Sequence, residues 1–398
     1  MLARRLQHTV LSNLCKISRC RLIRSFSEDG KKDGPQDNEP EISKLLDDAA
    51  NFNEANDTQW ATTPYPEGAS KELDDLDAPR EKLNPRDSSL ILFPGQGILK
   101  VGDVKEYMHF PAAKELFEIA KECLGYDLLK ICLRGPQEKL DRTEYNQPAT
   151  VVASLAALEK LREERPQVLE TCRGVAGYSV GELTALIFSG AMCFEDGIRL
   201  VGVRAAAMQK AASQSPQGMI FAYCTQTAEV SSICQNAKTW AMNAGSQIPE
   251  CSIAIYLYTQ AKIFGGCQNS LLYVEENASK MGLRKLKRLP VSGAFHTSLM
   301  APAQEPLKKA IRTIEYQDPI IPVYSNVTAK PYTSARKIPK NLLKQLVRPV
   351  KWEQIMHNLY ARPPGTAFPR TFDVGSKGSL KAILKQVNAK AWDNCIVV

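Results

Sequence analysis

The sequence lacks several features that define common protein classes. Its 11 cysteines include no C-x-x-C pair and are odd in number, which favours free thiols in a reducing compartment over a disulfide framework or a zinc site. No apolar stretch approaches the ~20 residues of a transmembrane helix, so we expect no membrane insertion. The basic residues lack interleaved aromatic residues and a recognised motif, so no nucleic-acid partner is expected.

The distribution of charge divides the chain into three segments. Residues 1–27 carry six basic residues and no acidic one, whereas residues 28–87 carry 17 acidic and 7 basic residues. Since the whole chain carries +8, residues 88–398 carry +12. The first segment is typical of a mitochondrial transit peptide, with a disordered basic arm as the alternative. The second is poor in aliphatic residues and is expected to be a largely disordered acidic linker.

The most informative stretch is a strand, a sharp turn and a helix around Ser179. Residues 174–176 are predicted to end a buried strand, and residues 182–188 to form a helix. Between them, Gly177-Tyr178-Ser179-Val180-Gly181 fits the G-x-S-x-G turn that presents a serine hydroxyl at a helix N-terminus. Backbone N–H groups at that position can stabilise an oxyanion. A glycine-rich turn with an inactive serine is the alternative.

A second functional loop is expected where the first strand of the folded domain ends. Leu90 to Phe93 form a continuous apolar run, which suits the middle of a parallel sheet. The run leads into Pro94-Gly95-Gln96-Gly97, and open α/β sheets place their ligand loops at such strand ends. Phosphate binding is one interpretation, although the G-x-x-x-x-G-K pattern is absent. The other is a loop whose backbone N–H and Gln96 side chain face the nucleophile.

The sequence pattern around Arg204 allows two interpretations. A helix is predicted from Glu195 to about Ala212, and Arg204 lies beside its apolar stripe, four residues before Met208. An arginine in such a position usually extends to water. Periodicity favours that interpretation over a buried guanidinium that binds a substrate carboxylate.

The pattern of predicted strands and helices changes at about residues 215–292, which are predicted to form an inserted subdomain. The expected elements are strands at 219–223, 252–258, 261–264 and 288–292 and helices at 230–238 and 270–281. Their β-α-β-β-α-β order is that of a ferredoxin-like unit. The basic run Arg284-Lys285-Leu286-Lys287-Arg288 lies on this unit, either as a surface for acidic partners or as protection of a strand edge.

Histidine is scarce, and a serine nucleophile needs a base. Of the four histidines, only His296 follows a predicted strand among small residues, at the far junction of the insert. Elimination therefore favours His296 as the base. No Asp or Glu stands in an obvious motif to orient its second nitrogen, so a backbone carbonyl is a candidate acceptor.

Six motifs occur in an order typical of one family. They are Phe93-Pro94-Gly95-Gln96-Gly97, Gln147-Pro148-Ala149, Gly177-Tyr178-Ser179-Val180-Gly181-Glu182, Arg204 with Met208-Gln209, Gly293-Ala294-Phe295-His296 with Leu299-Met300, and Pro349-Val350-Lys351-Trp352. Over about residues 88–390 the chain resembles the malonyl-CoA:acyl carrier protein transacylases of the acyltransferase-domain family, in particular the mitochondrial form of animals. The resemblance implies an α/β-hydrolase-like body with a parallel sheet and an inserted ferredoxin-like subdomain.

The resemblance implies roles for five residues at the reacting centre. Ser179 would be the acyl nucleophile and His296 the base, with the backbone carbonyl of Gln345 as acceptor for His296. Gln96 and the backbone N–H of Val180 would form the oxyanion hole.

Three further residues would contact the substrate. Arg204 would pair with the malonyl carboxylate, which reverses the preference drawn from periodicity, and Gln147 would line the pocket. Phe295, next to the base, would restrict the space beside the malonyl α-carbon. Two positions depart from the family pattern: Tyr178 stands where histidine is frequent, and Ile255 where asparagine is frequent. The resemblance implies that the departure at Ile255 removes a polar contact to the acyl or pantetheine chain.

The implied reaction is a ping-pong transfer of malonyl from malonyl-CoA to the phosphopantetheine thiol of acyl carrier protein, in the mitochondrial matrix. Both thiols are substrates, so no cofactor and no metal is expected. An acidic carrier protein would dock on Arg284, Lys285, Lys287 and Arg288. A serine thioesterase or hydrolase would share the serine motif without needing a carboxylate-binding arginine. A non-catalytic carrier-binding protein would lack an acylatable serine.

Overall fold

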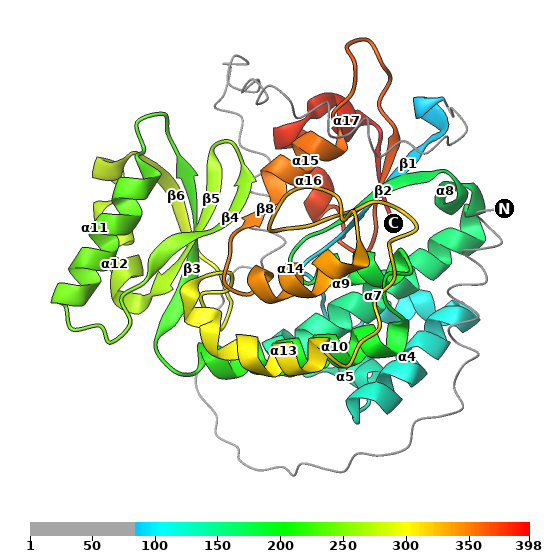
Figure 1. The fold of residues 1–398 in the computed structure, drawn as a ribbon, viewed down its shortest axis with the longest axis horizontal. Coiled ribbons are helices and arrows are strands. Elements are labelled where there is room, and N and C mark those ends of the chain that lie inside the picture. The colour runs from blue at the N-terminus through cyan, green and yellow to red at the C-terminus, as the bar shows by residue number, and fades with distance from the viewer. Residues whose placement is uncertain (1–83) are drawn as a thin grey trace.

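The structure, a computed structural model, describes residues 84–398, which form two subdomains built on two sheets (Figure 1). The expected transit peptide (1–27) and almost the whole expected linker (28–87) lie outside the described residues. Within residues 84–398, none of the helices has the length and apolar character that a membrane span requires.

The larger subdomain is built on a five-stranded parallel sheet with the order β10-β9-β1-β2-β7. Its strands are β1 (Ser89–Phe93), β2 (Cys172–Gly177), β7 (Val323–Tyr324), β9 (Arg370–Asp373) and β10 (Cys395–Val397). All five residues of β1 are buried, because helices cover both faces of the sheet. The apolar run that begins the folded domain therefore forms the central strand that its composition predicts.

Helices lie on both sides of this sheet, with α7, α9 and α10 on one side and α16 and α17 on the other (Figure 1). The helices of this subdomain are α4 (Pro111–Leu124), α5 (Leu128–Arg134), α6 (Gln137–Asp141), α7 (Thr143–Glu164), α8 (Pro166–Glu170), α9 (Gly181–Phe188), α10 (Phe194–Ala212), α13 (Gln304–Ile311), α14 (Ile338–Gln345), α15 (Trp352–Leu359), α16 (Ser379–Val387) and α17 (Ala389–Asp393). The predicted helices after Ser179 and around Arg204 are α9 and α10.

Pro148, in the Gln147-Pro148-Ala149 motif, lies inside an α-helix. Helix α7 begins at Thr143, so Pro148 lies in its interior rather than at its first turn. Proline has no N–H to donate to the carbonyl four residues earlier, which is that of Glu144. The hydroxyl of Tyr126 lies 3.4 Å from that carbonyl and donates to it instead. The proline thus leaves α7 continuous.

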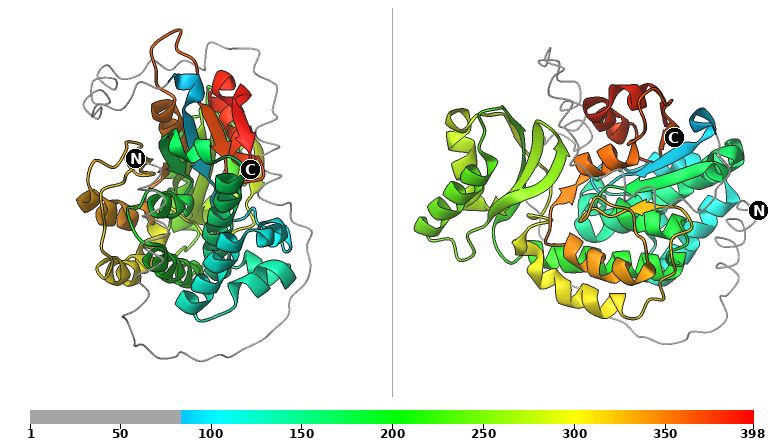
Figure 2. Two further views of the ribbon diagram at one scale, coloured as in Figure 1. Left: turned by 90° about the vertical axis from the view of Figure 1, so that its right-hand side faces the viewer. Right: turned by 45° about the horizontal axis from the view of Figure 1, so that its top comes forward.

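The smaller subdomain is built on a second five-stranded sheet with the order β6-β3-β5-β4-β8. Its elements are β3 (Gln217–Cys224), α11 (Val230–Asn243), β4 (Cys251–Tyr258), β5 (Ala261–Cys267), α12 (Gln268–Asn277), β6 (Leu283–Arg288) and β8 (Val350–Lys351). The first four strands in the order are antiparallel, as in a ferredoxin-like unit, and β8 adds in parallel to β4. Figure 2 shows this subdomain at one end of the larger one.

The last strand of the insert differs from the prediction. Strand β6 occupies Leu283–Arg288 and carries the basic run, whereas the apolar stretch at 288–292 was expected to be the strand. Leu289 and Val291 in that stretch instead line a pocket between the subdomains. A basic strand is tolerated here because β6 is at the edge of the sheet, where charged side chains reach water.

The two faces of the second sheet pack against different partners. Ala222 and Cys224 of β3 face a small core beneath α11 and α12. Met219 and Phe221 of the same strand belong to the main core, which extends into the larger subdomain. This alternation follows from the period of two along a strand. The α/β fold with a parallel sheet and a second, smaller subdomain is therefore confirmed.

Candidate active site

Ser179 lies at the sharp turn between β2 and α9 with a left-handed backbone, φ 54°. The turn requires glycine on both sides, since a Cβ at Gly177 would lie 1.9 Å from the Gly181 carbonyl oxygen. The Asn326 side chain holds the turn: its Nδ2 donates to Gly177 O at 2.7 Å, and its Oδ1 accepts from Ser179 N–H at 2.8 Å. A left-handed non-glycine residue costs about 1–2 kcal/mol, which these hydrogen bonds offset.

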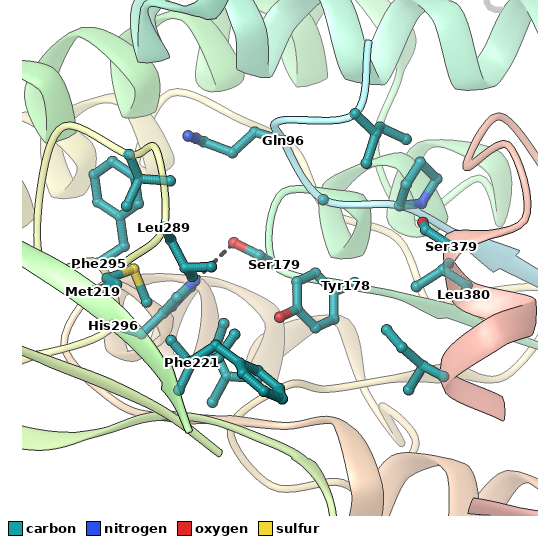
Figure 3. A pocket seen from close by; sticks show the side chains of 17 residues that line it. Gln96, Tyr178, Ser179, Met219, Phe221, Leu289, Phe295, His296, Ser379 and Leu380 are labelled. Atoms are coloured by element: carbon teal, nitrogen blue, oxygen red, sulfur yellow. Dashed lines mark hydrogen bonds between the residues drawn. The ribbon is translucent and has the colours of Figure 1, made fainter. Parts of the chain in front are cut away.

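Ser179 and His296 form a hydrogen-bonded pair (Figure 3). Ser179 Oγ lies 2.7 Å from His296 Nε2, and His296 Nδ1 lies 2.7 Å from the backbone oxygen of Gln345. A carbonyl oxygen only accepts, so Nδ1 carries the hydrogen and Nε2 is free to accept the serine proton. Burial, and then the positive charge of Arg204, lower the pKa of His296 to about 3. The imidazole is therefore neutral at physiological pH, as a general base must be.

Arg204 is buried beside the nucleophile rather than extended to water, so the preference drawn from periodicity was wrong. Its NH1 group donates to Gln147 Oε1 at 2.5 Å, its NH2 group donates to Gln345 Oε1 at 2.8 Å, and NH2 lies 3.5 Å from Ser179 Oγ. Helices α7 and α13 pack against α10, and the Arg204 side chain is 1% exposed. Burial lowers the pKa of Arg204 to about 10, so the side chain remains a cation at neutral pH.

The loop after β1 and the start of α9 border the nucleophile. Gln96 lines the pocket, and its Oε1 accepts a hydrogen bond from Gln147 Nε2 at 2.9 Å. The neighbouring Gly97 N–H donates to Asn146 Oδ1 at 2.8 Å, which removes one donor that a phosphate would need. Val180 directly precedes α9, where the first N–H groups have no partner within the helix. This geometry favours the interpretation in which the loop faces the nucleophile.

A buried carboxylate beneath the turn was missed by the sequence analysis. Glu182 has no exposed surface and accepts from Tyr332 Oη at 2.6 Å, from Gln345 Nε2 at 2.6 Å and from Asn326 N–H at 3.0 Å. Burial raises the pKa of Glu182, and these hydrogen bonds oppose the rise. Glu182 follows the serine turn in the sequence, so its position was visible. Of its partners, Asn326 and Tyr332 lie in segments that show no recognisable pattern, and the resemblance gave Gln345 a role only toward His296.

An apolar pocket extends from Ser179 between the two sheets (Figure 3). It is lined by Pro94, Gly95, Gln96, Ile98, Tyr178, Ser179, Met219, Phe221, Ile255, Ile263, Leu289, Val291, Phe295, His296, Ser379, Leu380 and Ile383. Tyr178 packs edge-on against Trp352, with ring centroids 5.3 Å apart. Both departures from the family pattern, Tyr178 and Ile255, therefore form the pocket wall. In the described part of the chain, no group of three or more His, Cys, Asp or Glu side chains is placed to hold a metal ion.

The four basic residues of the run 284–288 do not share one face. Lys287 lies opposite Phe221 in the sheet, so its side chain is on the pocket side. Arg288 lies opposite Ile220 and forms two hydrogen bonds to the Glu275 carboxylate of α12, at 2.7 and 2.8 Å. Arg284 and Lys285 are exposed on the same edge strand. Arg288 is thus held by the helix layer, apart from the pocket mouth.

Comparisons with known proteins point to one family. A family model described as an acyl transferase domain matches residues 111–368. The chain is 48% identical to a Drosophila melanogaster protein named a probable mitochondrial malonyl-CoA-acyl carrier protein transacylase. The alignment of 324 residues covers 80% of this chain and 86% of that protein. It is 42% identical over 351 residues to the mitochondrial malonyl-CoA-acyl carrier protein transacylase of Homo sapiens, covering 88% and 85% of the two chains. The structure of a malonyl CoA-acyl carrier protein transacylase from Coxiella burnetii matches with a TM-score of 0.70 and 29% identity, over 79% of this chain and 95% of that one.

Proposed function

Because the chain belongs to the acyl transferase family, we propose that it transfers malonyl from malonyl-CoA to the phosphopantetheine thiol of acyl carrier protein through an ester on Ser179. The observation that carries the proposal is the Ser179–His296 pair with the buried cation of Arg204 beside the serine hydroxyl. The pair supplies an activated nucleophile, and the cation selects an acyl group that bears a carboxylate.

In the first half-reaction, Ser179 Oγ attacks the thioester carbonyl carbon while His296 Nε2 takes the serine proton. The Gln345 carbonyl, 2.7 Å from Nδ1, stabilises the imidazolium that forms. The Oγ–C bond forms and the carbonyl π electrons move to oxygen, where Val180 N–H and Gln96 would stabilise the oxyanion. Collapse of this intermediate breaks the C–S bond, and the CoA thiolate takes the proton from His296. Malonyl-Ser179 remains.

In the second half-reaction, the pantetheine thiol of the carrier protein is deprotonated by His296 and attacks the same ester carbonyl. The Ser179 alkoxide leaves and is reprotonated by His296, so the enzyme returns to its starting state. Water is the competing nucleophile. A malonyl carboxylate held by Arg204 would fix the ester and help to displace water from the line of attack.

The shape of the pocket bears on acyl selectivity. Phe295 lines the pocket next to the base and is almost wholly buried, so its ring has little room to move. An extra methyl group on the malonyl α-carbon would meet this ring. We therefore propose Phe295 as a steric limit that disfavours branched malonyl groups.

The CoA phosphates and an acidic carrier protein would be attracted by the positive folded domain. Lys287, on the pocket side of the edge strand, together with Arg284 and Lys285, forms the proposed docking surface. Arg288 does not belong to this surface, because Glu275 already binds its guanidinium. Protection of the strand edge remains the competing explanation for these charges.

The proposed location is the mitochondrial matrix, where the product would feed fatty-acid synthesis. Two animal relatives are named as mitochondrial proteins, and residues 1–27 have the composition of a transit peptide. We propose the division into this peptide, an acidic linker (28–87) and an acyltransferase domain (88–398) with an insert at about 215–292. No cofactor is proposed, because the chemistry uses only side chains and the two thiol substrates.

Intact-mass analysis after incubation with malonyl-CoA tests the proposal. The wild-type chain should gain the mass of one malonyl group and then transfer it to holo- but not apo-carrier protein. Ser179→Ala should gain none, because no other residue would carry the ester. Release of free malonate without carrier acylation would identify a serine hydrolase instead, and an unmodified wild-type chain would identify a non-catalytic carrier-binding protein.

A further inference from the structure

The side-chain amide of Gln345 lies at the centre of the buried network and has one allowed orientation. Its Nε2 group donates to Glu182 Oε2 at 2.6 Å and to the Ser179 carbonyl at 3.0 Å. Its Oε1 accepts from Arg204 NH2 at 2.8 Å. A carboxylate and a carbonyl only accept, and a guanidinium only donates. Flipping the amide would therefore break three hydrogen bonds together.

Glu182 is itself fixed from two other directions. The Tyr332 hydroxyl donates to its Oε1 and the Asn326 N–H to its Oε2, so its carboxylate cannot rotate away from Gln345. It lies in the first turn of α9, directly beneath the nucleophile. Its hydrogen-bond partners therefore connect the serine turn to the residue that orients His296.

The arrangement keeps Arg204 charged yet open to a second anion. Glu182 is the counter-charge nearest to Arg204, but the Gln345 amide stands between the two. A direct Glu182–Arg204 ion pair would have to be broken before the guanidinium could bind an incoming carboxylate. Among the described residues, Arg204 Nε also has no hydrogen-bond partner, so the guanidinium retains a free donor.

We propose that Glu182 is a positioning residue for acyl selectivity: it fixes the Gln345 amide so that its oxygen holds the Arg204 guanidinium toward the acyl carboxylate. The proposal rests on the malonyl transfer proposed above. Glu182 touches neither substrate nor nucleophile side chain, and its effect passes through Gln345.

The test measures kcat/KM for malonyl-CoA and for acetyl-CoA and takes their ratio. Glu182→Met keeps the volume but removes the acceptor, so the ratio should fall about 10–100-fold, the value of a hydrogen bond to a charged group. Glu182→Gln should keep the ratio within about 3-fold of wild type, because an amide oxygen can accept from Gln345 while its nitrogen donates to the Tyr332 oxygen. Glu353→Met is the matched control, since Glu353 is also a buried glutamate in a first helical turn, that of α15, and binds Thr259 outside the site.

Two results would overturn the proposal. Equal losses for malonyl and acetyl in Glu182→Met would mean that Glu182 only supports the fold. If Glu182→Gln lowered the malonyl-to-acetyl ratio as much as Glu182→Met, the negative charge of Glu182 would matter and the orientation of the Gln345 amide would not. If Glu182→Met fails to fold, Gln345→Met removes the same amide and keeps the backbone carbonyl, and an unchanged ratio there would refute the proposal. A wild-type chain that never acylates the carrier would refute the proposed function itself.

Discussion

Replacing Arg204 by methionine is expected to separate malonyl transfer from acetyl transfer. The side chain is 1% exposed, and its guanidinium lies within 3.5 Å of the nucleophile oxygen. A malonyl ester on Ser179 would therefore place its free carboxylate against this cation, whereas an acetyl ester has no carboxylate to lose. Methionine fills most of the volume, so the change removes charge and donors without opening a large cavity.

The magnitude follows from the contacts. A bidentate, desolvated guanidinium–carboxylate pair contributes on the order of 3 kcal/mol, which corresponds to about a 100-fold loss in kcat/KM for malonyl-CoA. Methionine also leaves the side-chain oxygens of Gln147 and Gln345 without the donors that they have now, which are Arg204 NH1 and NH2 respectively. That cost applies to both acyl groups and cancels in their ratio. The kcat/KM of Arg204→Lys for malonyl-CoA should lie between those of the wild type and the methionine variant, because lysine keeps the charge but lacks the paired donors of a guanidinium.

The assay is the rate of acyl-carrier formation from malonyl-CoA and from acetyl-CoA, followed by mass spectrometry at several substrate concentrations. Thermal unfolding of both variants controls for damage to the fold. Equal losses for the two acyl groups would refute the argument and make Arg204 a structural residue.

Four further predictions concern pH, acyl shape, salt and the charge of the edge strand. Burial and the charge of Arg204 lower the pKa of His296 to about 3, so the imidazole stays neutral well below its ordinary pKa of 6.5. The acid limb of the pH profile of kcat/KM for self-malonylation should therefore lie far below pH 6. An acid limb centred near pH 6.5 would contradict this. Phe295→Ser should reduce the preference for malonyl-CoA over methylmalonyl-CoA. One methyl group limits that preference to about 1–3 kcal/mol. A wild-type enzyme that uses both substrates equally would refute the steric role of Phe295. Rising salt should lower kcat/KM for carrier protein but not for a neutral pantetheine acceptor, since charges are screened beyond ~10 Å at 0.1 M. Lys285→Glu with Lys287→Glu should weaken carrier use without slowing self-malonylation, and parallel salt curves for both acceptors would place docking elsewhere.

The parts of the site that the sequence predicts are those with local patterns. The turn around Ser179 depends on glycines within four residues of each other, and His296 follows from the scarcity of histidine. The hydrogen bonds that join Glu182 to Asn326 and Gln345, and Ser179 to Gln345, connect residues 144 to 166 positions apart, which no local pattern records. Gln345 was placed beside the base by the family resemblance alone. The roles of Glu182 and Asn326 are apparent only once the sheets are assembled.

Two errors in the sequence analysis share a physical cause. Periodicity shows which face of α10 is apolar but not that Gln147 and Gln345 enclose the Arg204 guanidinium, so periodicity alone favoured a side chain that reaches water. Likewise, the apolar stretch containing Leu289 and Val291 was expected to be a strand, whereas it lines the pocket beside the basic edge strand β6. In both cases the tertiary neighbours, rather than the segment itself, decide the outcome.

The distance along the chain between Ser179 and His296 has a consequence for refolding. The two residues are separated by 117 positions, and the complete insert lies between them. Gln345 and Asn326, which hold the pair, come later still. Contacts between distant segments form slowly, because the intervening loops must close first. After dilution from denaturant, helical signal should therefore return before the ability to accept malonyl, and the delay between the two would report the docking of the smaller sheet onto the larger subdomain.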